Sequence, residues 1–165
     1  MSDEISRVDE VHLRRCVELA TQALENGDDP FGSVLVDAEG ATLAEALNRE
    51  QSDRDPTAHP ELALVRWAIA HLTLDQRATT TVYTSGEHCP MCAAAHGWSG
   101  LGRVVAAASA AQLAQWRSSW GLPAGPVNPM PMRDVAPDVD VVAPVAPFDA
   151  QMHDVHRRAR AGRRA

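Results

Sequence analysis

The sequence contains no lysine, only three cysteines and no long apolar run. No uninterrupted stretch approaches the ~20 apolar residues that a bilayer-spanning helix needs, so we expect no membrane association. Three cysteines, two of them in one Cys-x-x-Cys motif, cannot form the disulfide framework of a small secreted domain. The polar, acidic residues 1–4 are also unlike a secretory signal. These absences favour a cytoplasmic protein.

Positive charge is scarce over most of the sequence. Residues 1–156 contain 22 acidic residues and 10 arginines, a formal charge of −12, and the other five arginines lie within residues 157–165. Binding to a long nucleic acid relies on positive charge, so the acidic body disfavours such a partner. We expect the basic segment 157–165 to be a solvated, mobile end of a helix, with a basic arm as the alternative.

The 165 residues suit a single domain, 1–165, with its own hydrophobic core. Apolar periodicity and turn residues predict an alternation of helices and strands. The expected elements are helix 6–26, strands 33–37 and 41–47, helix 59–71, strand 79–85, helix 91–98, strand 103–108, helix 110–116, strand 139–142 and helix 148–160. This order predicts an α/β protein, a three-layer α/β/α sandwich around a mixed five-stranded sheet. Residues 117–137 are rich in proline and glycine, and a loop of that length is more often functional than idle.

Two short motifs and one upstream asparagine indicate the chemistry. His59-Pro60-Glu61 is followed, 28 residues after the glutamate, by Cys89-Pro90-Met91-Cys92, and Asn48 precedes both. One histidine and two cysteines supply three zinc ligands and leave a fourth tetrahedral position open, as in catalytic zinc sites. Glu61 is then the natural proton carrier for the attacking water. The pattern is typical of zinc-dependent base deaminases, which convert a ring C–NH2 into a carbonyl and release ammonia.

Local context supports the ligand assignment. Cys89 and Cys92 lie at i and i+3 around the start of a predicted helix, where the helix dipole and free N–H groups favour thiolates. His59 lies at the start of the preceding helix, so two adjacent helices could present all three side chains to one ion. Glu61 lies roughly 200° round that helix from His59, which suits a proton shuttle better than a fourth ligand.

Two other classes of protein stay open at this point. A structural zinc module would need a fourth ligand from His88, His96 or Cys16, although Cys16 falls on the apolar stripe of the first helix and is expected in the core. A redox protein would use the Cys-x-x-Cys motif alone, which leaves Asn48, His59 and Glu61 unexplained.

With these residues in place, the sequence resembles the cytidine deaminase superfamily, in particular its His-Cys-Cys branch of guanine deaminases and tRNA adenosine deaminases. The matching segments are residues 29–36, 46–48, 55–59, 83–87, 89–93 and 102–105. The resemblance implies that His59, Cys89 and Cys92 bind Zn²⁺, that Glu61 shuttles protons and that Asn48 hydrogen-bonds the base. It also implies the α/β/α fold and a homodimer.

The sequence departs from the family pattern at two positions. Pro60 replaces the usual alanine, which is harmless at the first position of a helix. His88 replaces the proline that usually precedes the first cysteine. His88 could be a neutral residue packed beside the site, a residue that shapes substrate choice, or a further ligand.

The substrate is less well defined by the sequence. The His59 ligand argues against the smaller cytidine deaminases, which use three cysteines. A tRNA deaminase would be expected to carry polar residues in 106–111, where this chain has almost only alanine. We therefore expect a small free nucleobase or related amino-heteroaromatic ring, guanine-type favoured, with a tRNA adenosine deaminase or a nucleoside deaminase as alternatives. Phe31 and Trp98 could line the substrate pocket or belong to the core.

Overall fold

A five-stranded mixed sheet forms the centre of the computed structural model, which describes residues 5–162. The strands are β1 (Gly32–Val36), β2 (Thr42–Leu47), β3 (Thr81–Gly86), β4 (Arg103–Ala108) and β5 (Val141–Val142), in the order β2-β1-β3-β4-β5. β1 pairs antiparallel with β2 and β3, whereas β3–β4 and β4–β5 are parallel. The predicted mixed five-stranded sheet is confirmed.

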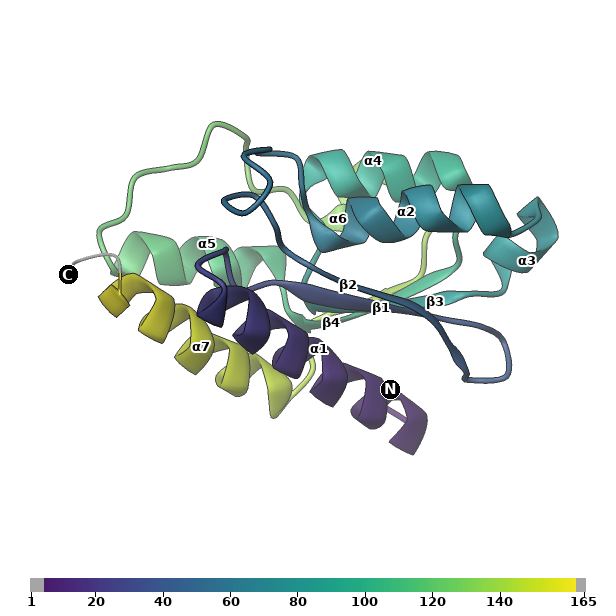
Figure 1. Ribbon diagram of the computed structural model, residues 1–165, viewed down its shortest axis with the longest axis horizontal. Coiled ribbons are helices and arrows are strands. Elements are labelled where there is room, and N and C mark those ends of the chain that lie inside the picture. The colour runs from purple at the N-terminus through teal and green to yellow at the C-terminus, as the bar shows by residue number, and fades with distance from the viewer. Residues whose placement is uncertain (1–4, 163–165) are drawn as a thin grey trace.

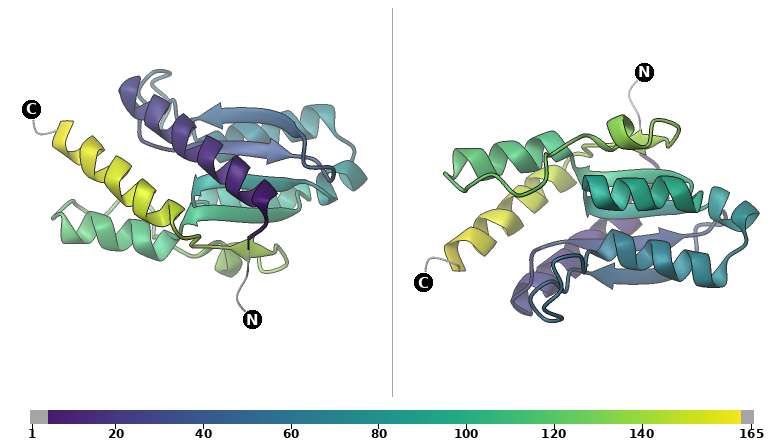
Figure 2. Two further views of the ribbon diagram at one scale, coloured as in Figure 1. Left: turned by 90° about the horizontal axis from the view of Figure 1, so that it is seen from below. Right: turned by 90° about the horizontal axis from the view of Figure 1, so that it is seen from above.

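Helices cover both faces of this sheet (Figures 1 and 2). They are α1 (Arg7–Glu25), α2 (Pro60–His71), α3 (Leu74–Ala78), α4 (Pro90–Ser99), α5 (Ala110–Ser119), α6 (Met132–Val135) and α7 (Phe148–Gly162). α1 and α7 pack together on one face, and α2 and α4 lie side by side on the other. The result is the predicted α/β/α sandwich.

Two hydrophobic cores lie on opposite sides of the sheet. Along β1 every residue is buried, with Val34 and Val36 in the core beneath α1 and α7 and Leu35 in the core beneath α2 and α4. Alternate side chains of a strand point to opposite faces, so a strand covered on both sides reads as one continuous apolar run. Cys16 is fully buried in the first core, as its position on the apolar stripe predicted.

Several boundaries differ from the sequence-based expectation. The single-turn helices α3 and α6 were not expected, β5 has only two residues, and α5 extends three residues further into the expected loop. The start of α3 does carry a sequence signal, because Thr73 and Gln76 form a reciprocal capping box. Residues 157–162 continue α7, whereas 163–165 of the predicted basic tail lie outside the described residues. None of the helices within residues 5–162 combines the length and apolar character needed to cross a bilayer.

Candidate active site

The two motifs meet where α2 and α4 begin. His59 is the N-cap residue of α2, Cys89 is the N-cap residue of α4, and Cys92 lies in the first turn of α4. Pro60 and Pro90 occupy first-turn positions, where their missing N–H groups cost nothing. Since the two helices pack side by side, one ligand atom from each of the three side chains lies within 4.8 Å of the others.

This group fits a zinc ion by distance and by donor type. His59 Nδ1 lies 3.5 Å from Cys89 Sγ and 3.7 Å from Cys92 Sγ. A tetrahedral zinc with ligands at ~2.0 Å for nitrogen and ~2.3 Å for sulfur would hold a nitrogen and a sulfur about 3.5 Å apart. The hydrogen bonds that Cys89 receives from Cys92 and His59 lower its pKa to about 4, against the effect of burial, and thereby favour the thiolate. The group is positioned to hold a metal ion.

The Glu61 carboxyl lies beside this group in a nearly closed environment. Glu61 is only 5% exposed, and this burial raises the pKa of its carboxyl group. Glu61 Oε1 accepts a hydrogen bond of 2.9 Å from Thr84 Oγ1, which in turn accepts one of 2.9 Å from Ser33 Oγ. The other oxygen, Oε2, lies 3.9 Å from Cys92 Sγ. One carboxylate oxygen is therefore anchored to the sheet while the other faces the ligand group.

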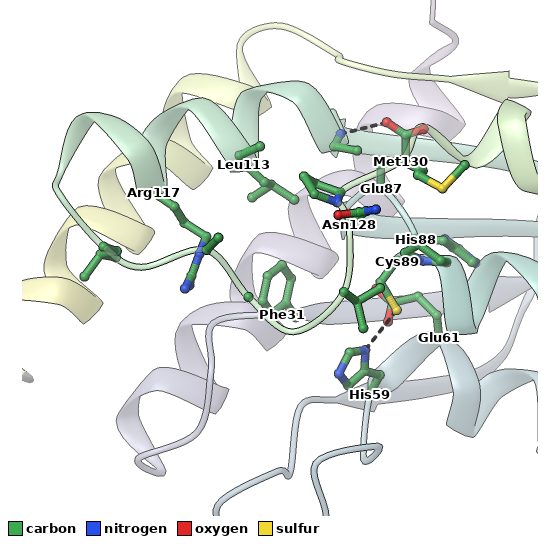
Figure 3. Close-up of a pocket in the computed structure, with 18 of the residues that line it drawn as sticks. Phe31, His59, Glu61, Glu87, His88, Cys89, Leu113, Arg117, Asn128 and Met130 are labelled. Carbon is green, nitrogen blue, oxygen red and sulfur yellow. Dashed lines mark hydrogen bonds between the residues drawn. The ribbon is translucent and has the colours of Figure 1, made fainter.

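A cavity of about 440 Å³ opens from the ligand group (Figure 3). Its polar end is formed by Asn48, His59, Glu61 and Cys89, and Arg117 lies at the far end. The outer wall is built largely by residues 122–130, within the segment for which the sequence predicted a functional role. A flat ring of a few heavy atoms fits easily in a cavity of this size.

Phe31 lines the cavity, as the sequence suggested it could. Its ring is held close to the sheet because Gly86, beneath it, has no side chain: an added Cβ would lie 3.0 Å from Phe31 Cε1 and 3.0 Å from Leu113 Cδ1. Phe31 and Leu113 thus form an apolar wall next to the polar end of the cavity.

Trp98 is not part of this site. Its side chain is 91% exposed on α4, and the cavity is lined without it. The reason lies in helical geometry: Trp98 follows the buried His96 by two residues, about 200° round α4, and therefore faces away from the sheet. Trp98 therefore neither lines this cavity nor belongs to the core, the two roles that the sequence left open for it.

His88 is buried immediately behind Cys89. It is 1% exposed, and its ring packs edge-on against His96 with ring centroids 5.1 Å apart. Burial, together with His96, keeps the pKa of His88 well below its usual range, so the ring is neutral. His96 Nε2 lies 2.8 Å from the Gly102 carbonyl oxygen, and the ligand group brings together His59, Cys89 and Cys92 without His88, His96 or Cys16.

Two acidic residues that the sequence analysis did not single out, Glu50 and Glu87, contact residues and segments that line the site. Glu50 Oε1 lies 3.1 Å from His59 Nε2 and accepts a hydrogen bond of 2.8 Å from Asn48 Nδ2. Glu87 accepts 2.7 Å bonds from the backbone N–H groups of Ala110 and Met132, the first residues of α5 and α6. Glu87 has no sequence signal because its partners lie 23 and 45 residues away. Glu50 is close in sequence to Asn48 and His59, but only the path of the loop decides that these side chains meet.

A partly buried His-Cys-Cys group with an adjacent buried carboxyl, at the first turns of α2 and α4 in an α/β/α sandwich, defines a metal-dependent site with room for a small ligand. Residues 6–108 match the model of the cytidine and deoxycytidylate deaminase zinc-binding region. The chain belongs to this zinc-binding deaminase family.

Comparisons with individual proteins give the same family. The chain is 41% identical to the guanine deaminase of Bacillus subtilis over 90 residues, which is 54% of this chain and 57% of that protein. It is 36% identical to the tRNA-specific adenosine deaminase of Haemophilus influenzae over 104 residues, 63% of this chain and 60% of that protein. The matches thus span under two thirds of these relatives. The solved structure of the guanine deaminase from Nitrosomonas europaea superimposes with a TM-score of 0.71 over 92% of this chain and 84% of its own, at 21% identity, and this likeness shows the fold.

Proposed function

We propose that this protein catalyses the hydrolytic deamination of a small free nucleobase or related amino-heteroaromatic ring, with guanine-type rings favoured and ammonia as a product. The observation that carries the proposal is a three-ligand metal group with a buried carboxyl beside it at the end of a ring-sized cavity. The match to the guanine deaminase of Bacillus subtilis supports the favoured ring.

In this proposal His59, Cys89 and Cys92 hold the zinc ion. When bound, zinc supplies Lewis acidity that makes a water molecule nucleophilic near neutral pH. The Glu61 carboxylate accepts one proton of that water as the water oxygen bonds to the ring carbon, and passes this proton to the neighbouring ring nitrogen. It then accepts the proton of the newly formed hydroxyl group and passes it to the departing amine. The C–N bond to the amine breaks as the ring carbonyl forms, so water and the amino ring become the oxo ring and ammonia.

Asn48, Phe31 and His88 are the proposed substrate-side residues. Asn48 is buried and lines the polar end of the cavity, where its amide can hydrogen-bond the edge of a base. Phe31 offers an apolar wall against which a flat ring can pack. His88 lines the cavity from directly behind Cys89, where its bulk shapes the inner end.

The preference for a free base over a nucleic acid rests on charge. Residues 1–156 carry a formal charge of −12, which opposes a phosphate backbone. The alanine-rich stretch adds little to this argument, because Ala106–Ala108 lie in the buried strand β4 and would not meet a tRNA in any case.

We further propose that the protein is cytoplasmic, that each chain forms a single deaminase domain, and that two chains form a homodimer. The three cysteines are free thiols, which suits a reducing compartment. The neighbouring helices α2, α3 and α4 each expose one large apolar side chain, namely Ile69, Leu74 and Trp98. Exposed tryptophan is typical of protein–protein interfaces.

An ammonia-release screen of the purified protein tests the function. Guanine, cytosine, adenine, the corresponding nucleosides and a tRNA anticodon stem-loop containing adenosine would be compared at equal concentration. We expect turnover of at least one free base and none of the stem-loop. Adenosine-to-inosine conversion in the stem-loop without activity on any free base would instead support a tRNA adenosine deaminase and overturn the proposal.

Metal content tests the site separately. We expect about one zinc ion per chain in the purified protein and its loss in Cys89→Ala and in Cys92→Ala. Stoichiometric zinc in both variants would rule out the ligand group.

A further inference from the structure

One carboxylate oxygen joins the proposed metal ligand to the proposed base contact. Glu50 Oε1 lies 3.1 Å from His59 Nε2 and 2.8 Å from Asn48 Nδ2. The Glu50 backbone N–H in turn donates a 3.0 Å bond to Asn48 Oδ1. All three side chains are buried or half-buried, with Glu50 20% and His59 26% exposed, so bulk water competes only weakly for these bonds.

We infer that Glu50 is a positioning residue that orients His59 toward the metal ion and Asn48 toward the substrate ring. The Asn48 half of this inference rests on the proposed deaminase function, whereas the His59 half requires only that the ligand group binds a metal.

The effect on His59 follows from the chemistry of imidazole. A neutral histidine carries its proton on one ring nitrogen and a lone pair on the other. The Glu50 carboxylate, 3.1 Å from Nε2, favours a proton on that nitrogen. When a metal ion replaces the hydrogen bond between Nδ1 and Cys89, the lone pair is then on Nδ1, the atom that faces the two cysteine sulfurs at 3.5 and 3.7 Å. Carboxylate partners of this kind fix the ring orientation of metal-binding histidines and raise their basicity.

The effect on Asn48 follows from counting hydrogen-bonding groups. Asn48 has two N–H donors and two acceptor positions, and Glu50 occupies one of each. The amide is thereby held in one orientation, with one N–H and one lone pair left for a ring at the polar end of the cavity. Because Glu50 contacts both His59 and Asn48, a change of this one side chain should affect both metal binding and ring recognition.

The loop that carries Glu50 has other supports of its own. Arg49 N–H donates to the Ala58 carbonyl at 3.1 Å, and Asp55 N–H donates to the backbone carbonyl of Glu50 at 3.1 Å. Asp28 accepts bonds from the N–H groups of Gln51 and Ser52 at 2.8 and 2.9 Å. The loop is therefore expected to keep its path when only the Glu50 side chain changes.

Zinc affinity, measured by competition with a chromophoric chelator at constant pH, tests the inference without reference to any substrate. Loss of a carboxylate that supports a metal ligand typically weakens metal binding about 10–100-fold. We expect this loss in Glu50→Ala. The matched control is Asp53→Ala, which removes an acid from the same loop. The Asp53 side chain pairs with the exposed Arg49 side chain, so its loss should leave zinc affinity unchanged.

The outcomes separate this inference from the proposed function. Zinc affinity within twofold of wild type in Glu50→Ala, or an equal loss in Asp53→Ala, would overturn it, even if the protein deaminates a base. If Glu50→Ala does not fold, the isosteric Glu50→Gln decides: weaker zinc binding supports the inference, and unchanged binding overturns it. For whichever ring is turned over, KM should also rise in Glu50→Ala but not in Asp53→Ala.

Discussion

The two carboxylate oxygens of Glu61 have different neighbours, Thr84 and Cys92, and this arrangement suits its proposed role as a proton carrier. Thr84 holds one carboxylate oxygen from the sheet side, while the other faces the ligand group, and burial raises the pKa of the carboxyl. A carboxyl with a raised pKa both accepts and returns protons more readily near neutral pH than an exposed one. Its position after His59 could be predicted from the motif, but its support by Thr84 could not.

Glu61→Gln should keep the zinc ion and the fold yet remove the path for protons. Turnover is expected to fall by at least the ~10²–10⁴ typical of losing general acid–base catalysis. Ammonia release, zinc content and base affinity would be measured on one preparation. Near wild-type turnover with zinc present would mean that another group carries the proton, and joint loss of zinc and activity would make Glu61 a ligand.

Thr84→Val should lower turnover without changing zinc content. The variant keeps the side-chain shape but loses the hydroxyl that contacts Glu61, and a hydrogen bond to a charged group is worth ~1.5–3 kcal/mol, equivalent to roughly 10–100-fold in rate. Thr84 Oγ1 also lies 2.9 Å from the Gly86 carbonyl oxygen, which shares its proton, so we expect the lower part of that range.

The conservative variant Thr84→Ser provides the control. It restores the hydroxyl and should restore kcat to near the wild-type value. If Thr84→Val and Thr84→Ser lose the same activity, the effect comes from packing and Thr84 does not position Glu61.

At the scale of helices and strands, most of the fold could be predicted because its signals are local. The 3.6-residue periodicity of α1 and the apolar runs of β1 and β4 each lie within one short segment. The single-turn helix α6 could not be predicted, because its first N–H is satisfied by Glu87, 45 residues away in sequence. The same holds for Thr84 within the site, since its partner Glu61 lies 23 residues away, whereas the ligand motif is read from fixed spacings. Glu50 lies near Asn48 and His59 in sequence, but its role depends on the path of the loop that joins them.

Glu87, just before α4, holds both ends of the segment that builds the outer cavity wall. Its carboxylate accepts one N–H at the start of α5 and one at the start of α6, and residues 122–130 between them build the outer cavity wall. Glu87→Ala should loosen this segment, so that trypsin cleaves faster at Arg117 or Arg133 and KM rises more than kcat falls. Loss of a helix-capping acceptor typically costs ~0.5–2 kcal/mol, so thermal stability should also fall.

The exposed Glu39→Ala is the control for Glu87→Ala, since Glu39 lies in the β1–β2 turn far from the wall. Equal cleavage rates in both variants and wild type would contradict the role assigned to Glu87.

The buried Asp9 carboxylate of α1 contacts Tyr83 of β3 and Arg103 of β4, and it should make the free energy of unfolding depend on pH. Burial raises the pKa of Asp9, but the hydrogen bonds from Ser6 and Tyr83 and the charge of Arg103 outweigh it, so the pKa is lower than usual. A carboxyl with a lowered folded-state pKa contributes stability above its unfolded value, ~3.9, and loses it as the pH falls through the folded value.

Asp9→Asn should therefore destabilise the protein by roughly 1.5–3 kcal/mol at pH 7, the range for hydrogen bonds to a charged group. The difference from wild type should shrink as the pH falls from about 4, the unfolded value, through the lower folded-state pKa, below which the wild-type carboxyl is also neutral. Urea unfolding at pH 7 and pH 3 measures both values. An equal difference at the two pH values would show that the charge of Asp9 is not what stabilises α1.

At the scale of the whole molecule, the charge distribution can be read from the sequence, whereas the exposed apolar surface can be read only from the fold. The acidic body and the arginines of residues 157–165 are visible in the sequence, but the sequence does not show which apolar residues the fold leaves exposed. Trp98 illustrates this limit: the sequence left a pocket role and a core role open for it, and only the direction of α4 shows that it lies on the surface. A tryptophan that is 91% exposed on the outer side of the α2–α4 layer needs a different explanation, for which a second copy of the chain is the proposed partner.

Trp98→Glu tests that explanation, because a charge at the centre of an apolar interface is strongly unfavourable while a charge on a free surface is not. We expect wild type to be a dimer by light scattering at micromolar concentration and Trp98→Glu to be a folded monomer. Val11→Glu is the matched control: Val11 is an exposed apolar residue of α1, in the layer on the opposite face of the sheet, and its replacement should leave the dimer intact. A monomeric wild type, or dissociation caused by Val11→Glu and not by Trp98→Glu, would show that the α2–α4 side is not the interface. Because Trp98 lies outside the cavity, its variant should also retain zinc, so loss of the dimer can be separated from damage to the site.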